Sequence, residues 1–304
     1  MLSLDRVLDG LVVDVEPFAL CEVRGEGRLE VGCQDRATLH YVIAGTGAFR
    51  VAAWPDISAK AGTVVIIPPA VPHRLRAGGQ GGAVLPHCMP LEPGWAHRSA
   101  GDGEEGVLVT CGRIRASYRD VEGVFNYLHE PIVTDLAHNE GLGHALTQIL
   151  NEFASPRPGS RALIRALMQQ LLIMLLREHC VGGQCHIPWM AAAQDERLWA
   201  ATGYIFGNPE AAHSLDALAE RAGMSRSSFA ERFKNTFGRG PMDLVRELRL
   251  VQAAQLLTNS DIPVKTVAEQ VGYDSRSYFS RAFRDAFGLS PADYRLQQQS
   301  DGEL

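Results

Sequence analysis

Two stretches near the end of the chain carry polar side chains whose types and spacing suit contact with DNA. A helix turns by about 100° per residue. A helix over residues 225–237 would therefore begin with Arg226 and present on its outer face Ser227, Ser228, Glu231, Lys234 and Asn235. A helix over residues 275–287 would begin with Arg276 and present on the same face Ser277, Tyr278, Arg281, Arg284 and Asp285. Groups of these kinds hydrogen-bond to base edges and phosphates in a major groove. The alternative is a helical bundle whose outer faces are only solvated.

The cysteines are a second set of residues with possible chemistry. They are too few and too scattered for a disulfide scaffold, and no CxxC pair occurs, so we expect reduced thiols at all six positions. Cys180, Cys185 and His186 offer three metal ligands but lack a fourth, which argues against a zinc site.

One cysteine lies in a glycine- and proline-rich insertion, residues 78–106, which is either a disordered surface loop or a functional one. A reactive thiol needs exposure and a lowered pKa. Cys88, beside His87 in this insertion, could have both. Cys111, at the end of the apolar run Val107–Cys111, is expected to have neither.

The elements that would position the two polar faces occur as a repeat. The copies read LAERAGMSRSSFAERFKNTFGRGP and VAEQVGYDSRSYFSRAFRDAFGLSP, and their phenylalanines recur 50 positions apart. Each copy predicts a short helix, a reversal at Gly223 or Gly272, and a capped second helix. The predicted cap is Ser225 in the first copy and Ser275 or Asp274 in the second. The phenylalanines of each second helix are spaced four residues apart, which predicts an apolar stripe that packs inward. The repeat therefore predicts two helix-turn-helix units.

The first 115 residues or so favour β structure. Short apolar runs such as Thr38–Ile43, Ala48–Ala52 and Thr63–Ile67 alternate with Gly- and Pro-rich turns, a pattern typical of a small sandwich or barrel. The segment TLHYVIAGTGAFRV has the form of strand, Gly-x-Gly turn and strand, which predicts a hairpin.

From Tyr118 the pattern becomes helical, and its longest run is residues 161–180. Leu171–Leu176 is apolar on every side, so we expect partial cover from the β domain and partial cover from a second subunit. Burial of a few Leu and Ile side chains would contribute about 2 kcal/mol each, enough to hold a homodimer. The predicted organisation is a β domain with dimerisation helices at 1–180, a linker at 181–195 and a DNA-binding domain at 196–298.

Size and charge limit the function classes. The chain of 304 residues has room for two domains. No secretory signal or long apolar stretch is present, so we expect a cytoplasmic protein without a membrane segment. The net charge of −6 argues against a protein that coats DNA regardless of its sequence, but residues 225–250 hold six basic and three acidic side chains. Local positive charge of this kind favours a sequence-specific binder.

The second repeat with its flanks, IPVKTVAEQVGYDSRSYFSRAFRDAFGLSPADYR, resembles the signature of the AraC/XylS transcriptional regulators nearly residue for residue. The resemblance implies an activator or repressor in which a long helix, near Pro241–Leu257, joins two helix-turn-helix units. It implies recognition helices at Ser225–Phe237 and Ser275–Phe287, which enter successive major grooves. The partners it implies are promoter or operator DNA, RNA polymerase and a small-molecule effector or oxidant.

The segment AGTVVIIPPAVPHRL, which contains His73, resembles the second motif of the cupin family, and Cys111-Gly112-Arg113 matches cupin-type sensor domains of one AraC branch. Metal-binding cupins place two histidines and a glutamate where this chain has Gly32, Gln34 and Thr38. His73 alone remains, and one histidine does not hold a catalytic metal. No metal or cofactor is therefore expected, and His73 is predicted to be structural or to face a ligand.

Part of this branch resembles regulators that respond to reactive chlorine by oxidising cysteines of the cupin domain. Cys21 lies, like the first sensing cysteine of that group, ahead of the first strands. The second sensing cysteine corresponds to Leu108, whereas Cys88 lies in the insertion. The candidate sensing residues are therefore Cys21, Cys88 and His73.

The predicted fold class is α+β, with a cupin-like β-barrel or jelly roll, dimerisation helices and a C-terminal all-α domain with two helix-turn-helix units. The predicted function is a non-enzymatic, sequence-specific transcriptional regulator that senses a small molecule or oxidant. One alternative is a metal-dependent cupin enzyme with an accessory helical domain, which the missing metal ligands disfavour. Another is a co-regulator that dimerises but binds no DNA.

Overall fold

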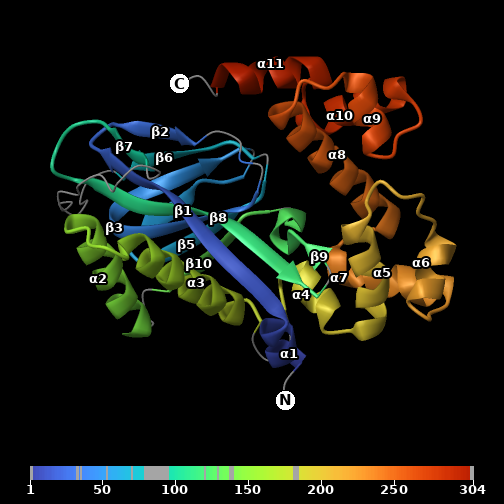
Figure 1. The fold of residues 1–304 in the computed structure, drawn as a ribbon, viewed down its shortest axis with the longest axis horizontal. Coiled ribbons are helices and arrows are strands. Elements are labelled where there is room, and N and C mark those ends of the chain that lie inside the picture. Colours follow the sequence, from blue (N-terminus) through green and yellow to red (C-terminus); the bar gives the residue numbers. More distant parts are fainter. Residues whose placement is uncertain are drawn as a thin grey trace. The chain divides into compact units, whose positions relative to one another are not determined.

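The structure, a computed structural model, describes residues 3–31, 34, 36–52, 54–69, 71–78, 96–119, 121–128, 130–136, 140–180 and 185–301. It contains two compact units, and each is assembled from separate stretches of the chain (Figure 1). The barrel unit comprises Val12–Ala116 and Leu128–Val181. The helical unit comprises Met1–Leu11, Ser117–Tyr127 and Gly182–Leu304.

The described strands form a barrel-shaped sheet that follows the path β10–β5–β3–β8–β1–β7, with β2, β4, β6 and β9 paired off this path. The strands are β1 Leu11–Arg24, β2 Arg28–Val31, β3 Thr38–Val51, β4 Ile57–Lys60, β5 Thr63–Ile67, β6 His73–Ala77, β7 Ala96–Ala100, β8 Gly106–Tyr118, β9 Val121–Glu122 and β10 Ile132–Asp135. The interior is a mainly apolar core that includes Phe49, Val65, Leu75 and Val109. The α+β class is thus confirmed.

The segment TLHYVIAGTGAFRV is one continuous strand, β3, and not the predicted hairpin. A register shift between Val42 and Ala44 bends β3 against β8. Its first half pairs with β5 and its second half with β4 and β6. Gly45, at φ 80, lies so near β8 that a Cβ atom there would be 1.9 Å from the Gly106 carbonyl oxygen. The glycine therefore permits a close approach of two backbones, which a local turn pattern cannot reveal.

Two helices, α2 Glu140–Ala154 and α3 Ser160–Glu178, lie beside the sheet (Figure 1). Helix α3 packs on β8 where Gly112 has no side chain, since a Cβ there would be 2.8 Å from Met168 Cε. Leu171, Leu172, Leu175 and Leu176 are fully buried within the single chain. The prediction that a second subunit must cover this apolar segment is therefore wrong for these four leucines.

The insertion and the cysteines differ in part from expectation. Residues 96–100 of the insertion form β7, which pairs in parallel with β1. Residues 79–95, including Cys88, lie outside the described residues. Cys21 and Cys111 are free thiols, but Cys180 and Cys185 are disulfide-bonded, so the expectation of reduced thiols is wrong for this pair.

The described helices of the helical unit are α1 Ser3–Asp9, η1 Val124–Tyr127, α4 Pro188–Ala193, α5 Glu196–Gly207, α6 Leu215–Arg221, α7 Arg226–Phe237, α8 Pro241–Asn259, α9 Val264–Gln270, α10 Arg276–Phe287 and α11 Pro291–Asp301. Residues Ser117–Tyr127 join them through aromatic contacts. The Tyr118 ring packs edge-on against Trp199 at 4.9 Å between centroids, and Tyr127 stacks on Phe206 at 3.9 Å. No helix within the described ranges is long and apolar enough to cross a membrane.

Candidate nucleic-acid interface

The first helix-turn-helix consists of α6 and α7. Ser225 caps α7, because its hydroxyl accepts a hydrogen bond from the Ser228 N–H at 3.3 Å. Gly223 turns the chain at φ +59, and Gly238 ends α7 at φ 70, both in the left-handed region that favours glycine. Phe229, Phe233 and Phe237 are buried, so the predicted inward stripe is confirmed.

The second helix-turn-helix, α9 and α10, repeats this construction. The Ser275 hydroxyl accepts from the Tyr278 N–H at 3.3 Å, and Gly288 ends α10 at φ 75. Phe279 and Phe283 are fully buried, and Phe283 packs edge-on against Tyr294 of α11. Helix α8 joins the two helix-turn-helix units, as predicted, and extends to Asn259 (Figure 1).

The predicted DNA-contacting residues of both copies are exposed on the sides of α7 and α10 away from the phenylalanines. They are Arg226, Ser227, Ser228, Glu231, Lys234 and Asn235 on α7, and Arg276, Ser277, Tyr278, Arg281 and Arg284 on α10. Tyr278 is 53% exposed. Arg226 is ion-paired with Asp216 of α6 at 3.4 Å. Among the described residues, Lys234, Arg281 and Arg284 form no ion pair.

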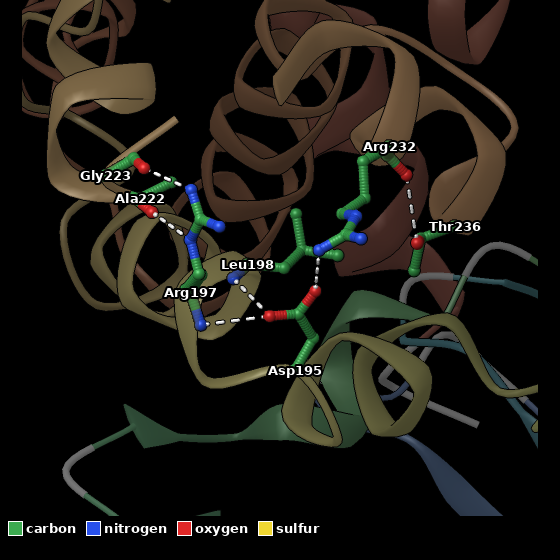
Figure 2. Close-up of polar contacts among 7 residues, drawn as sticks. All are labelled: Asp195, Arg197, Leu198, Ala222, Gly223, Arg232 and Thr236. Atoms are coloured by element: carbon green, nitrogen blue, oxygen red, sulfur yellow. Dashed lines mark hydrogen bonds and ion pairs between the residues drawn. The ribbon is translucent and has the colours of Figure 1, made fainter. Parts of the chain in front are cut away.

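A polar network outside the predicted set fixes the first unit to the helix before it (Figure 2). One oxygen of Asp195 caps α5 by accepting from the N–H groups of Arg197 and Leu198 at 3.0 and 3.3 Å. Its other oxygen accepts from Arg232 of α7 at 2.7 Å. Arg197 in turn donates to the carbonyl oxygens of Ala222, at 3.2 Å, and Gly223 in the turn. These contacts hold α7 against α5 and join residues that are far apart in the sequence, so helical periodicity alone does not identify them.

Two of the predicted sensing residues lie in the core of the barrel unit. Cys21 on β1 and His73 at the start of β6 are 2% and 3% exposed. The third, Cys88, lies outside the described residues. Two residues that the sequence reasoning did not select, His40 on β3 and Cys111 on β8, complete the cluster.

The cluster is a chain of contacts through the barrel. His40 Nε2 is 2.8 Å from the Thr38 hydroxyl, and His40 Nδ1 is 3.1 Å from the Cys111 sulfur. The Cys111 thiol donates to the Cys21 sulfur, 3.6 Å away. The His73 ring lies edge-on to His40 at 4.7 Å between centroids. His40 and Cys111 are direct partners in the β3–β8 register, which is a long-range pairing that a single strand pattern does not contain.

Burial sets the protonation of this cluster. It lowers the pKa of His73 to about 4, and it holds the pKa of His40 well below the ordinary value, with help from the neighbouring His73. Both imidazoles are therefore neutral at physiological pH. The hydrogen bond from Cys111 lowers the pKa of Cys21, against burial and with help from Arg98. The same hydrogen bond, burial and the Cys21 charge raise the pKa of Cys111.

Metal binding has little geometric support here. Among the described residues, no group of three or more His, Cys, Asp or Glu side chains is arranged to hold a metal ion. Thr38, at one of the expected ligand positions, instead bonds to His40.

Comparison with known proteins agrees with these two structural parts. A family model described as a helix-turn-helix domain matches residues 218–297, and one described as a cupin matches residues 3–181. The transcriptional regulator AlkR of Acinetobacter baylyi is 24% identical over 97% of this chain and 99% of its own length. An AraC-like transcription regulator of Streptomyces antibioticus is 30% identical, covering 72% and 71% of the two chains.

A third relative is the RCS-specific HTH-type transcriptional activator RclR of Escherichia coli, 29% identical over 66% of this chain and 72% of its own. Among solved structures, the DNA-binding domain of AdpA in complex with a target DNA is 32% identical and covers 33% of this chain and 91% of that chain, with a TM-score of 0.33. The repeated helix-turn-helix, the cupin barrel and these relatives together establish that the chain belongs to the AraC family of DNA-binding transcriptional regulators with an N-terminal cupin domain.

Proposed function

We propose that this regulator reads DNA with the exposed faces of α7 and α10, and that its barrel unit senses an oxidant through Cys21 and Cys111. The DNA contacts would come from Arg226, Ser227, Ser228, Glu231, Lys234 and Asn235 on the first helix and from Arg276, Ser277, Tyr278, Arg281 and Arg284 on the second. Their support is the shared exposure of matched positions in two copies of one motif. In each helix the opposite side is occupied by buried phenylalanines, so only this face is open to a groove.

The observation that carries the sensing proposal is the 3.6 Å distance between the Cys21 and Cys111 sulfur atoms. A disulfide needs about 2.05 Å, so a small shift of adjacent strands β1 and β8 would bring the sulfurs to bonding distance. The relative RclR carries RCS specificity in its name. In this proposal the partner of Cys21 is Cys111 in place of Cys88, the candidate taken from the sequence, and Cys88 is not required for the response.

Because Cys21 is only 2% exposed, the proposal requires an oxidant that is small and neutral enough to enter the barrel. The reaction consumes one molecule of such an oxidant, for example hypochlorous acid. Cys21, whose pKa is lowered, attacks the chlorine, and the bond between chlorine and oxygen breaks to release hydroxide. The Cys111 sulfur then displaces chloride from the Cys21 sulfur and loses its proton. In total, two thiols and one hypochlorous acid give one disulfide, one chloride ion, one proton and one water molecule. Oxidation shifts the balance between two arrangements of the protein, only one of which favours DNA binding.

The test is oxidation of the purified full-length protein with one equivalent of hypochlorous acid, followed by peptide mapping and a DNA-binding assay. We expect a Cys21–Cys111 cross-link and a change in DNA affinity that dithiothreitol reverses. Cys21→Ser and Cys111→Ser should each abolish both effects. Cys88→Ser serves as the matched control and should respond as the wild type does. A full response in Cys111→Ser together with loss of response in Cys88→Ser would refute the assignment.

Further partners follow from the family and belong to the same proposal. We infer a cytoplasmic regulator that contacts RNA polymerase and acts by binding, without catalysis. A homodimer through the 161–180 helix would use its outer face, where Leu163 is 40% exposed, because the inner leucines belong to the core of the chain. The division into a sensor at 1–180, a linker at 181–195 and a DNA-binding domain at 196–298 is part of this proposal.

A further inference from the structure

One arginine of the joining helix is bonded to both helix-turn-helix units. Arg249, in the middle of α8, donates from Nε to the carbonyl oxygen of Pro209 at 2.8 Å and from Nη2 to those of Glu210 and Ala211 at 3.3 and 2.8 Å. These carbonyls belong to the loop that leads into α6. Its Nη1 donates to the carbonyl oxygen of Gly272, at 2.8 Å, in the turn of the second unit. A single guanidinium thus connects the entry of the first unit to the turn of the second.

The two backbones also approach each other closely at this point. Gly272 has φ +81, and a Cβ atom there would lie 2.4 Å from the Glu210 carbonyl oxygen and 3.0 Å from Arg249 Cζ. Gly223, the matching residue of the first copy, has φ +59 and nothing within 4 Å of such an atom. The motif itself therefore needs a left-handed glycine in the turn, while the close approach at Gly272 comes from contact between the two units.

The corresponding clamp in the first copy acts differently. Arg197 holds the turn of its own unit, through Ala222 and Gly223, from the preceding helix. Arg249 holds its turn and, in addition, three carbonyls of the other unit. Only a guanidinium has a rigid fork of donors that can serve carbonyls in several directions at once.

We propose that Arg249 and Gly272 form the joint that sets the separation and rotation of α7 relative to α10, and so determines which spacing of two DNA half-sites the protein accepts. Arg249 is a positioning residue in this role and touches no DNA. The inference rests on the proposed reading of DNA by α7 and α10. One inserted base pair moves a half-site by about 3.4 Å and rotates it by about 35°, so a rigid joint must discriminate between spacings.

The experiment uses the full-length protein and DNA from the region upstream of its own gene. Hydroxyl-radical footprinting first locates the two protected segments, and duplexes with one base pair inserted or removed between them are then compared. The readout is the ratio of Kd on the altered spacing to Kd on the natural spacing. We expect a ratio of about tenfold or more for the wild type, similar to the effect of a mismatched base pair.

Arg249→Ala should reduce this ratio to less than about threefold, because the helices can then adjust to either spacing. Arg249→Lys keeps the positive charge but places all its donors on one nitrogen. Compared with Arg249→Ala, it should therefore regain affinity for DNA but not the discrimination between half-site spacings. Arg246→Ala removes an exposed arginine from the same helix. Any change in its affinity should be equal at all spacings, which leaves the ratio unchanged.

A second pair of variants avoids dependence on Arg249. Gly272→Ala and Gly223→Ala each add one methyl group at matched positions with positive φ. Only the methyl group at position 272 would clash with the Glu210 carbonyl oxygen, ahead of the first helix-turn-helix unit. Gly272→Ala should change the preferred spacing or reduce the ratio, and Gly223→Ala should keep the wild-type ratio. A wild-type ratio in both Arg249→Ala and Gly272→Ala would overturn the inference and leave the proposed DNA reading intact. A wild type indifferent to spacing would overturn both.

Discussion

His73 is a titratable side chain whose behaviour is set by its burial in the barrel. It is 3% exposed, its Nδ1 lies 3.2 Å from the Val71 carbonyl oxygen, and no described group hydrogen-bonds to its Nε2. A proton on Nε2 would therefore be placed in an apolar core without an acceptor. This environment explains why the folded protein keeps the imidazole neutral.

The barrel should consequently lose stability in mild acid. In the unfolded chain His73 titrates near pH 6.5, whereas burial lowers its folded pKa to about 4. The unfolded state binds the proton first as the pH falls, so this contribution is complete above about pH 6.5 and is lost progressively toward pH 4. Between pH 7 and pH 5 the loss due to His73 should be about 2 kcal/mol, measured by hydrogen exchange of β5 and β6 amides. His40, whose pKa burial also lowers, adds a loss in the same direction. His73→Gln should remove the His73 part of the dependence and leave the His40 part, and an unchanged dependence in this variant would contradict the account.

The sensing cluster shows what a sequence leaves undetermined about single residues. Cys21 and His73 can be selected from their positions and motifs, but His40 and Cys111 become neighbours only through the pairing of β3 with β8. That register depends on contacts between residues about 70 positions apart in the chain. The burial that lowers the pKa of both histidines, and the hydrogen bond that shifts the pKa of the two cysteines in opposite directions, are equally properties of the folded barrel.

Among the elements, α7 and α10 were the most predictable. Their caps, their phenylalanine spacing and their terminal glycines are local features that agree with one another, and the repeat presents them twice. Strand β3 was less predictable, because its Gly-x-Gly segment has the local pattern of a turn. Contact with β8 at Gly106 instead keeps it extended. Local patterns therefore identify the helices here, while the sheet depends on long-range contacts.

The phenylalanine stripe should carry much of the stability of each helix-turn-helix. The side chains of Phe233 and Phe283 are fully buried, with 0% exposed, whereas Phe287 is half-buried. Phe233→Ala and Phe283→Ala should each destabilise the helical unit by about 3–5 kcal/mol through the cavity they leave. Phe287→Ala should cost clearly less. Thermal unfolding followed by circular dichroism would measure the difference, and equal effects at Phe283 and Phe287 would contradict the assigned packing.

The whole molecule combines a negative net charge of −6 with two exposed, locally basic faces on α7 and α10. General attraction to DNA is weak for such a chain, so affinity must come from particular side chains in the grooves. Specific contacts of this kind are consistent with a regulator that selects few sites. We propose that Lys234 of α7 and Arg281 of α10 supply such contacts from both helix-turn-helix units.

The most direct test is the Kd for DNA from the region upstream of its own gene, measured by fluorescence anisotropy at several salt concentrations. Lys234→Ala and Arg281→Ala should each weaken binding by about tenfold, and the double variant by about a hundredfold, with circular dichroism unchanged. Lys265→Ala, which removes an exposed lysine of α9 paired with Glu269, should bind as the wild type does. Wild-type affinity in the double variant would contradict the reading of DNA by α7 and α10.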